Sequence, residues 1–129
     1  METESQEAGP RRRFLVVDDS EDNRFLARHA LLKAFPGAEV IEAATAEAAI
    51  GIAQSAHLDG VVTDHHLGDQ DGAGFMQQLR DAGVRCPVVM VTASSDPRVH
   101  RRAYDVGAAR VFAGSDWDFV PFFRKLMGP

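Results

Sequence analysis

The 129-residue sequence predicts a single α/β domain, in which a parallel sheet of five strands is covered by helices on both faces. Short, continuous apolar runs alternate five times with longer amphipathic segments, and such runs are typical of strands that are buried on both faces. No composition break, internal repeat or low-complexity stretch interrupts this alternation. We expect residues 1–12 to form a solvated tail and residues 13–129 to form the domain.

The first strand is predicted at the apolar run Phe14–Val17, which ends at Asp18-Asp19. A helix should follow from about Ser20. The residues that recur in it at helical spacing are Phe25, Leu26, His29, Leu32 and Lys33. Phe35-Pro36-Gly37 ends this helix, because proline cannot continue the backbone hydrogen bonds and glycine suits the turn.

The second strand is the short segment Val40-Ile41. Thr45 should begin the next helix, because its hydroxyl can accept a hydrogen bond from an early backbone amide. That helix carries an apolar stripe made of Ala46, Ala49, Ile50 and Ala53. The third strand is predicted at Leu58–Thr63 and ends at Asp64.

We expect a loop from His65 to Gly72, then a third helix that Gly83 ends. Its apolar face carries Phe75, Met76 and Leu79. The fourth strand, Pro87–Val91, ends at Thr92.

Asp96-Pro97 favours a helix start, with aspartate as the N-cap and proline at the first helical position, and this helix should run to about Val106. Val111–Ala113 is the fifth strand. The last helix spans the apolar residues around 119–127, where Pro121 is tolerated only in the first turn.

The charge and cysteine content exclude several classes of protein. Lysine and arginine number 14 against 19 aspartates and glutamates, which gives a formal charge of −5 and argues against a broad nucleic-acid or anionic-membrane surface. The single cysteine, Cys86, excludes an internal disulfide framework. The segment Met1–Pro10 does not resemble a signal peptide, and no apolar run approaches the roughly 20 residues that span a bilayer. We therefore expect a cytoplasmic protein.

Polar residues follow three of the predicted strands directly: Asp18 and Asp19, then Asp64, then Thr92. Ligands of parallel α/β sheets bind beyond the carboxyl ends of the strands, so these side chains should converge. Carboxylates that lie close together need a compensating cation, and Mg²⁺ prefers oxygen ligands of this kind. A single aspartate at a strand end is more often a turn former, and Asp19 could simply cap the first helix. The combination is more specific than any of its members.

These residues resemble the receiver domain of two-component response regulators. The resemblance covers roughly residues 13–127 and rests on the segments Phe14–Asp19, Val61–Asp64, Asp71-Gly72, Pro87–Ala93 and Gly107-Ala108. It implies the flavodoxin-like, CheY-like fold with strand order 2-1-3-4-5.

The resemblance also implies a role for each site residue. Asp64 corresponds to the phosphoacceptor and Thr92 to the switch hydroxyl. Asp18 and Asp19 correspond to the acids of the Mg²⁺ site, to which Asp64 and the backbone carbonyl of His66 contribute further ligands. The phosphoryl donor in this family is a phosphohistidine on a sensor histidine kinase or a histidine phosphotransfer protein.

The sequence departs from the family pattern at three positions. Receivers carry a Lys-Pro pair just after the fifth strand, where this chain has Gly114-Ser115. We expect the lost positive charge to weaken stabilisation of the phosphorylated state and to increase reliance on Mg²⁺. Val111 replaces the aromatic residue that many receivers use to couple to the switch hydroxyl. Gly68 stands where a proline is common and should make the loop after Asp64 more mobile.

Three functional hypotheses follow. The first is a stand-alone receiver that accepts phosphate at Asp64 with Mg²⁺ and signals by protein contact; it takes part in phosphoryl transfer to itself and is not an enzyme with a separate substrate. The second is a pseudo-receiver that docks a protein without phosphorylation. The third is a Mg²⁺-dependent phosphatase or hydrolase with its own substrate; no Asp-x-Asp nucleophile motif stands directly at the end of a predicted strand, and no substrate-binding insertion is visible. Partners would be a kinase or phosphotransfer protein and a downstream protein, with no nucleic acid and no membrane.

Two groups of residues each allow two interpretations. His65-His66 suggests a metal site, although we favour His65 packing against the sheet and His66 flanking the pocket mouth. Tyr104 and Trp117 are expected on the face formed by the fourth and fifth helices, which receivers use for partners and through which a dimer could form. Core packing is the alternative for Trp117.

Overall fold

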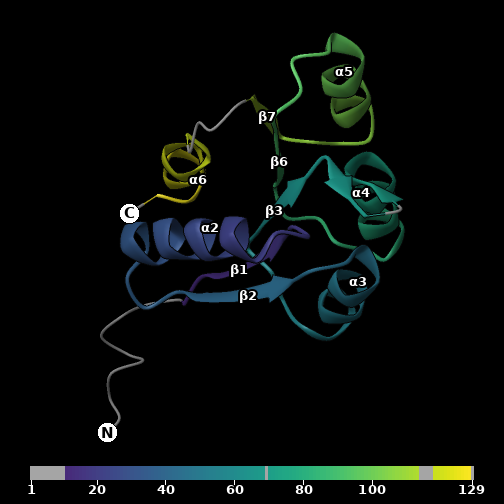
Figure 1. The fold of residues 1–129 in the computed structure, drawn as a ribbon. Helices are drawn as coiled ribbons and strands as arrows, with labels where there is room; N and C mark the ends of the chain where they lie inside the picture. Colours follow the sequence, from purple (N-terminus) through teal and green to yellow (C-terminus); the bar gives the residue numbers. More distant parts are fainter. Residues whose placement is uncertain (1–10, 69, 114–117, 129) are drawn as a thin grey trace, which may run out of the picture.

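The computed structural model describes residues 11–68, 70–113 and 118–128. Five parallel strands form the main sheet in the order β2-β1-β3-β6-β7, which is 2-1-3-4-5 when these strands alone are counted (Figure 1). Their bounds are β1 (Arg13–Val17), β2 (Glu39–Ala43), β3 (Gly60–Asp64), β6 (Val88–Thr92) and β7 (Arg110–Ala113). The predicted fold class and strand order are confirmed.

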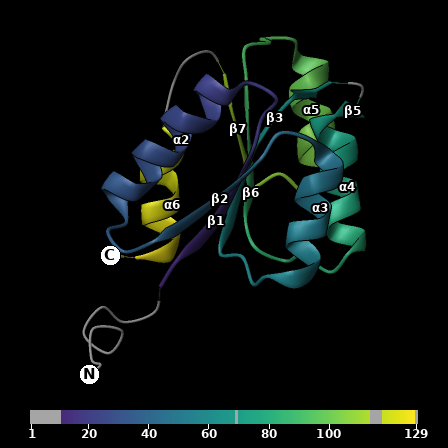
Figure 2. The ribbon, with the colours of Figure 1, turned by 60° about the horizontal axis from the view of Figure 1, so that its bottom comes forward.

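Helices cover both faces of the sheet. They are α2 (Glu21–Ala34), α3 (Ala46–Ser55), α4 (Gly72–Asp81), α5 (Pro97–Asp105) and α6 (Phe119–Met127). α2 and α6 lie on one face, and α3, α4 and α5 lie on the other (Figure 2). Among the described residues, no helix combines the length and apolarity needed to cross a membrane.

The register of the sheet determines which residues share its carboxyl edge. Val17 is level with Thr63 of β3, so Asp18 and Asp64 are each the next residue outward. Asp64 pairs with Val91, which places Thr92 one step beyond it on β6. Three polar residues from three adjacent strands therefore emerge at one edge.

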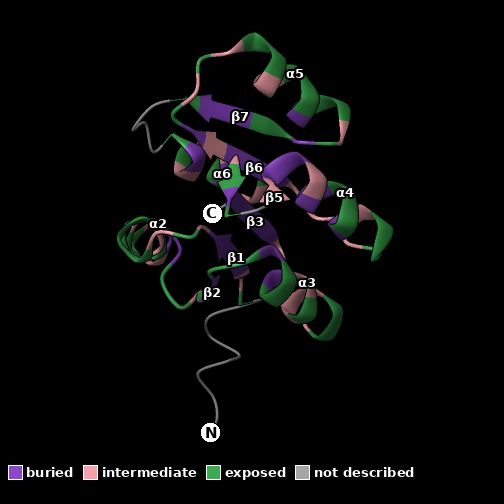
Figure 3. Ribbon diagram, turned by 45° about the vertical axis from the view of Figure 1, so that its right-hand side comes forward, coloured by how far each residue is buried: buried purple, intermediate pink, exposed green. Residues whose placement is uncertain are grey.

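Each face of the sheet has its own apolar core, visible as the buried inner faces of the elements in Figure 3. Beneath α3, α4 and α5 the core is mainly aliphatic, with Leu15, Val61, Phe75, Met76, Leu79 and Met90. Beneath α2 and α6 it is rich in aromatic residues, with Phe14, Phe35, Phe112, Phe119 and Phe123. Phe14 contacts both Phe35 and Phe123, with ring centroids 5.0 and 5.4 Å apart.

The first predicted helix is present as α2, but the residues at helical spacing do not all face the sheet. Phe25 and Leu26 are 61% and 49% exposed, and α2 instead buries Ala27 and Leu31. The ring of Phe25 stacks on that of His29, one turn later, on the outer side of the helix, with centroids 5.9 Å apart. The helical spacing was correctly recognised, but spacing alone does not say which stripe of a helix meets the sheet.

Side-chain caps begin four of the helices. Ser20, Thr45, Asp71 and Asp96 each accept a hydrogen bond from a backbone N–H of the following first turn, as Thr45 and Asp96 were predicted to do. Because Ser20 caps α2, Asp19 does not, and the alternative that Asp19 is simply a helix cap is excluded. Pro121 lies in the first turn of α6, as its tolerance requires.

The segment expected to be a loop between β3 and the third helix contains a small antiparallel hairpin. Its strands are β4 (His66–Leu67) and β5 (Gln70–Asp71). Gly68 lies in the turn with φ of +70°, a conformation that favours glycine. The glycine is therefore explained by the turn itself, and its predicted effect on loop mobility stays a prediction.

The N-terminal arginines take part in the fold. Arg12 donates to the carbonyl of Met127 at 2.8 Å, and its own carbonyl accepts from Glu39. Arg13 pairs with the Glu39 carboxylate at 2.8 Å, and its backbone N–H donates to Asp59. These contacts tie the start of β1 to β2 and to the end of α6.

Tyr104, which was expected on a partner surface, forms a hydrogen bond at the outer edge of the sheet. Its hydroxyl accepts from the backbone N–H of Val111 at 3.0 Å. In the described sheet β7 pairs only with β6, so this N–H lies on the open side of an edge strand. Such edges are sites of unwanted strand pairing, and α5 covers this one with a side chain.

Replacing Tyr104 with phenylalanine should lower the free energy of unfolding by about 1 kcal/mol, because the Val111 N–H loses its partner while the ring is kept. Urea unfolding measures the change. Ser95→Ala is the matched control, since it removes an exposed hydroxyl for which the described residues offer no hydrogen bond. If the two variants unfold at the same urea concentration, the Tyr104 hydrogen bond does not stabilise the sheet edge.

Candidate functional site

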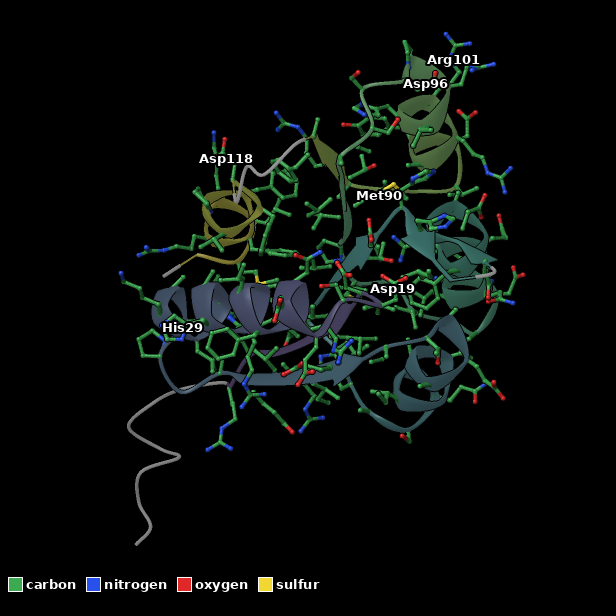
Figure 4. The ribbon with its side chains drawn as sticks, viewed as in Figure 1. Asp19, His29, Met90, Asp96, Arg101 and Asp118 are labelled. Carbon is green, nitrogen blue, oxygen red and sulfur yellow. The ribbon has the colours of Figure 1, made fainter. Side chains whose placement is uncertain are left out.

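Three carboxylates converge at the carboxyl edge of the sheet. One oxygen from each of Asp18, Asp19 and Asp64 lies within 4.8 Å of the others. Asp18 and Asp19 follow β1, and Asp64 is the last residue of β3. Asp19, labelled in Figure 4, is the exposed member, and the other two are half-buried. The predicted convergence of these three acids is therefore present in the structure.

Local hydrogen bonds hold Asp18 in place. Its Oδ1 accepts from the Ser20 N–H at 2.9 Å, and its own N–H donates to the carbonyl of Ala43 at 3.1 Å. Arg24 of α2 donates to the Asp18 carbonyl at 2.8 Å. The turn between β1 and α2 is thereby tied to both neighbouring elements, and the acid pair is positioned by backbone contacts.

Asp64 lies at the centre of the cluster. Burial raises the pKa of its carboxyl above the usual value, and the nearby Asp19 raises it further. The backbone N–H groups of His65 and His66 act in the opposite direction, and that of His65 donates to Asp64 Oδ1 at 2.7 Å. Burial dominates, so ionised Asp64 is less stable here than in water.

The pKa of Asp18 is raised for related reasons. Burial is again the largest cause, and the charges of Asp64 and Asp19 add to it, against the hydrogen bond from Ser20. Two carboxyls thus resist ionisation together. A cation that binds between them lowers the free-energy cost of ionising both carboxyls, because its positive charge replaces the stabilisation that water would otherwise give.

The donor set fits Mg²⁺. Carboxylate oxygens from three residues are hard ligands, and Mg²⁺ is typically held by a few such groups together with water. The fourth predicted ligand, the backbone carbonyl of His66, belongs to strand β4 of the hairpin. The neighbouring carbonyl of His65 accepts from the Gly72 N–H at 2.6 Å. The ligand role of His66 stays a prediction.

Thr92 stands beside Asp64 on the adjacent strand and is only 3% exposed. Its hydroxyl accepts from the Ser94 N–H at 3.0 Å. Among the described residues no acceptor faces the hydroxyl proton, so Thr92 can donate to a group bound at Asp64.

A chain of hydrogen bonds leads from Thr92 to helix α5. The Ser94 hydroxyl accepts from the Asp96 N–H at 3.1 Å, and Asp96 caps the helix. The Ser94 carbonyl lies 2.8 Å from Nε2 of His100, which donates to it. Sequence reasoning missed Ser94 and His100 as a connected pair. The only available signal was the run of short polar residues before the Asp96-Pro97 helix start.

Asp18, Asp64 and Thr92 also line one cavity of about 470 Å³, together with Asn23 and Leu26 of α2. The sequence showed Leu26 only as one of several residues at helical spacing and indicated no role for Asn23. Their position at the cavity depends on how α2 lies across the sheet, which no sequence motif indicated.

Gly72 permits a close approach of two backbones. Its N–H donates to His65, and a Cβ at this position would collide with the carbonyl oxygen of Asp64 and lie 2.9 Å from the Met90 methyl. Only glycine lets the first turn of α4 pass directly behind the end of β3. Asp71, just before it, caps α4 and pairs with Arg102 of α5 at 3.4 Å.

The remaining predicted residues divide into two groups. His65 lines a separate pocket of about 320 Å³ with Asp71, Met90 and Arg102, and His66 is exposed. Neither histidine side chain belongs to the group of possible metal ligands in the described chain, which disfavours a histidine metal site. Gly114, Ser115 and Trp117 lie outside the described residues.

Comparison with known proteins gives consistent matches over most of the chain. A family model described as the response regulator receiver domain matches residues 14–113. The two-component response regulator ORR41 of Oryza sativa subsp. japonica is 31% identical over 118 residues, which cover 90% of this chain and 88% of that protein. The glycerol metabolism activator of Pseudomonas putida is 31% identical over 97 residues, covering 74% of this chain but 44% of that protein. The chain therefore spans less than half of the second relative.

Solved structures share the fold. The chemotaxis protein CheY4 of Vibrio cholerae superposes with a TM-score of 0.78 at 26% identity, covering 91% of this chain and 97% of that one. A CheY-like receiver domain protein from Methanospirillum hungatei JF-1 gives a TM-score of 0.82 at 20% identity, covering 91% and 94%. At that identity the second likeness concerns the fold alone.

Proposed function

Because this chain belongs to the response regulator receiver domain family, we propose that it accepts a phosphoryl group on Asp64 from a phosphohistidine donor. The observation that carries the proposal is the convergence of Asp18, Asp19 and Asp64 within 4.8 Å, with Thr92 on the next strand lining the same cavity. A nucleophilic carboxylate, further acids for a metal and a hydroxyl donor are thus grouped at one edge of the sheet.

In the proposed reaction a carboxylate oxygen of Asp64 attacks phosphorus and forms an acyl phosphate. The bond between phosphorus and the donor imidazole nitrogen breaks, and its electron pair stays on that nitrogen, which then takes up a proton. The backbone N–H of His65, at 2.7 Å from Asp64 Oδ1, keeps the carboxylate oriented. The Thr92 hydroxyl donates a hydrogen bond to a phosphoryl oxygen in the product and keeps its proton.

Asp18 and Asp19 would hold Mg²⁺ together with Asp64. When bound, the ion would supply positive charge to the phosphoryl oxygens during transfer. The donor would be a sensor histidine kinase or a histidine phosphotransfer protein, and the product would signal by contact with a downstream protein in the cytoplasm. The hydrogen-bond chain from Thr92 through Ser94 to α5 supports a path from the site to a protein surface.

A pseudo-receiver that docks a protein without phosphorylation is the second candidate. It is favoured by Gly114 at the position where the family carries lysine, and by Val111 at the position of the coupling aromatic residue. Without that lysine, the site would have to stabilise a phosphoryl group with one positive charge fewer.

Phosphorylation can be tested by intact-mass spectrometry after incubation with acetyl phosphate and millimolar Mg²⁺. We expect the mass of a single phosphoryl group to be added, and the addition to disappear when EDTA removes Mg²⁺. With this donor the bond between phosphorus and the acetyl oxygen breaks, and acetate leaves with the electron pair of that bond. If no adduct forms over a range of Mg²⁺ and acetyl phosphate concentrations, and a beryllofluoride complex does not form either, the pseudo-receiver is the better description.

A further inference from the structure

We propose that the cavity beside Asp64 binds an alkylammonium group, with its primary ammonium at the carboxylates and its apolar stem along the cavity walls. The inference deepens the proposed function, because the cavity opens onto the proposed phosphoacceptor. It names a ligand class for the part of this site that the metal and the phosphoryl group do not fill.

The walls of the cavity are apolar over most of their length. α2 runs along one face of the sheet (Figure 2). The cavity is lined by Leu26 from this helix and by Val16, Val62 and Val91 from β1, β3 and β6. The volume of about 470 Å³ lies within the roughly 300–1,000 Å³ typical of small-molecule sites. Several methylene groups can therefore be buried here.

One end of the cavity is strongly acidic. Asp18 and Asp64 form it together with the polar side chains of Asn23 and Thr92. No lysine, arginine or histidine is among the described residues that line the cavity. The described residues therefore bring no cation to this end, and even with Mg²⁺ bound the three ionised carboxylates would keep a net negative charge.

Arg24 does not supply the missing charge. Its guanidinium donates to the Asp18 carbonyl at 2.8 Å and pairs with Glu42 at 3.2 Å. Glu42 also lies 3.9 Å from Arg28, and neither arginine is among the described residues that line the cavity. The charge of Arg24 is used to fasten α2 to β2.

The two ends of the cavity together select the ligand. An inorganic cation satisfies the carboxylates but leaves the exposed apolar surface of Leu26 and Ala93 facing water. A neutral apolar molecule covers the walls but displaces water from the carboxylates. It offers them no hydrogen bond or charge in return, so their desolvation costs free energy. A primary ammonium donates up to three hydrogen bonds and carries the needed charge, while an unbranched stem buries apolar surface. Leu26, 49% exposed, stands at the boundary between cavity and solvent and leaves room for entry.

Binding can be measured by NMR on the unphosphorylated protein, at constant ionic strength and with Mg²⁺ present. The probe is n-butylammonium chloride, compared with methylammonium, which lacks the stem, and n-butanol, which lacks the charge. We expect saturable amide shifts around Val16, Leu26 and Val62, and a dissociation constant at least about tenfold lower for n-butylammonium than for either comparator, because three more methylenes or one charge are satisfied. Equal binding by a comparator, or shifts that do not saturate, would overturn the proposal.

A pair of exposed alanines provides the variant and its control. Ala93 lines the cavity, and Ala93→Leu should narrow it and weaken n-butylammonium binding about tenfold or more. Ala48→Leu adds the same side chain on the exposed face of α3 and should leave binding unchanged. Loss of binding in both variants, or in neither, would place the binding elsewhere and contradict the assignment.

The origin of the ammonium group is decided by a second probe, lysine blocked as Nα-acetyl-lysine N-methylamide. If it binds about as well as n-butylammonium, the cavity accepts a lysine side chain from a docked protein. If only n-butylammonium binds, the ligand is a free amine. Both results support the inference. Because the readout needs no phosphorylation, amine binding without a phosphoryl adduct would reject only the proposed function, and an adduct without amine binding would reject only this inference.

Discussion

Replacing Asp64 with asparagine is expected to abolish phosphorylation by acetyl phosphate completely, while the protein stays folded. The amide has the shape of the carboxylate but lacks the anionic oxygen that attacks phosphorus. Asp18 and Asp19 lie close enough to share a metal ion, yet neither is the residue that the hydrogen bond from His65 orients. Intact-mass spectrometry measures the adduct in the variant and in the wild-type protein side by side.

Asp105→Asn is the matched control, because Asp105 is exposed on α5 and makes no ion pair with another described residue. It should be phosphorylated to the same extent as the wild-type protein. An adduct that persists in Asp64→Asn would mean that another side chain accepts the phosphoryl group, and peptide mapping would then identify it.

The same substitution should also change stability in a pH-dependent way. Burial raises the pKa of Asp64, so the folded protein holds its proton more tightly than the unfolded chain does. The folded state consequently loses stability as the pH rises from below 3.8 through the raised pKa. Without Mg²⁺ at neutral pH, Asp64→Asn should therefore unfold at a higher temperature than the wild-type protein. The difference should shrink at about pH 3, where the wild-type carboxyl is protonated in both states.

Gly72→Ala is expected to impair both stability and phosphorylation, because the new Cβ has no space. It would collide with the backbone carbonyl of Asp64 and approach the Met90 methyl at 2.9 Å. The methyl can move, but the carbonyl belongs to β3 and can shift only with the strand end that carries the phosphoacceptor. We expect the free energy of unfolding to fall by about 2 kcal/mol, as for overpacked core sites. Phosphorylation should slow as well, because the carboxylate is displaced.

Gly51→Ala separates this effect from helix propensity. Gly51 lies within α3, and a Cβ there would meet nothing within 4 Å. Alanine at this position should stabilise the protein by up to about 1 kcal/mol. Urea unfolding and the rate of adduct formation should be compared for both variants. If Gly72→Ala behaves like Gly51→Ala, the start of α4 has room to move and the close approach to Asp64 is unimportant.

Local patterns in the sequence predicted much of the fold. Alternating apolar runs predicted the five strands and their helices, and Asp96-Pro97 and Thr45 marked two helix starts correctly. Side-chain caps and proline act within a few residues, so their effects can be read from neighbouring positions. The strand order came from the likeness to a family, since periodicity does not say which strands are neighbours.

The site was predictable in its members but not in its surroundings. Asp18, Asp19 and Asp64 follow strands, and the carboxyl ends of parallel strands share one edge, so their convergence follows from the pattern itself. Leu26 was recognised only as part of a helical pattern, and Asn23 had no predicted role. Both line the cavity because of the way α2 rotates and lies across the sheet, which depends on packing of Ala27 and Leu31 against distant strands.

The sequence by itself determined the fold class, the helix starts and the acids that meet at the sheet edge, because each depends on local chemistry or on the common direction of the strands. Only the tertiary structure decided that Gly72 passes behind Asp64, that Tyr104 covers the edge of β7 and that the described lining of the cavity has carboxylates but no basic side chain. These features join residues far apart in the chain. Their distances are fixed by the packing of helices on the sheet, and no local pattern encodes that packing.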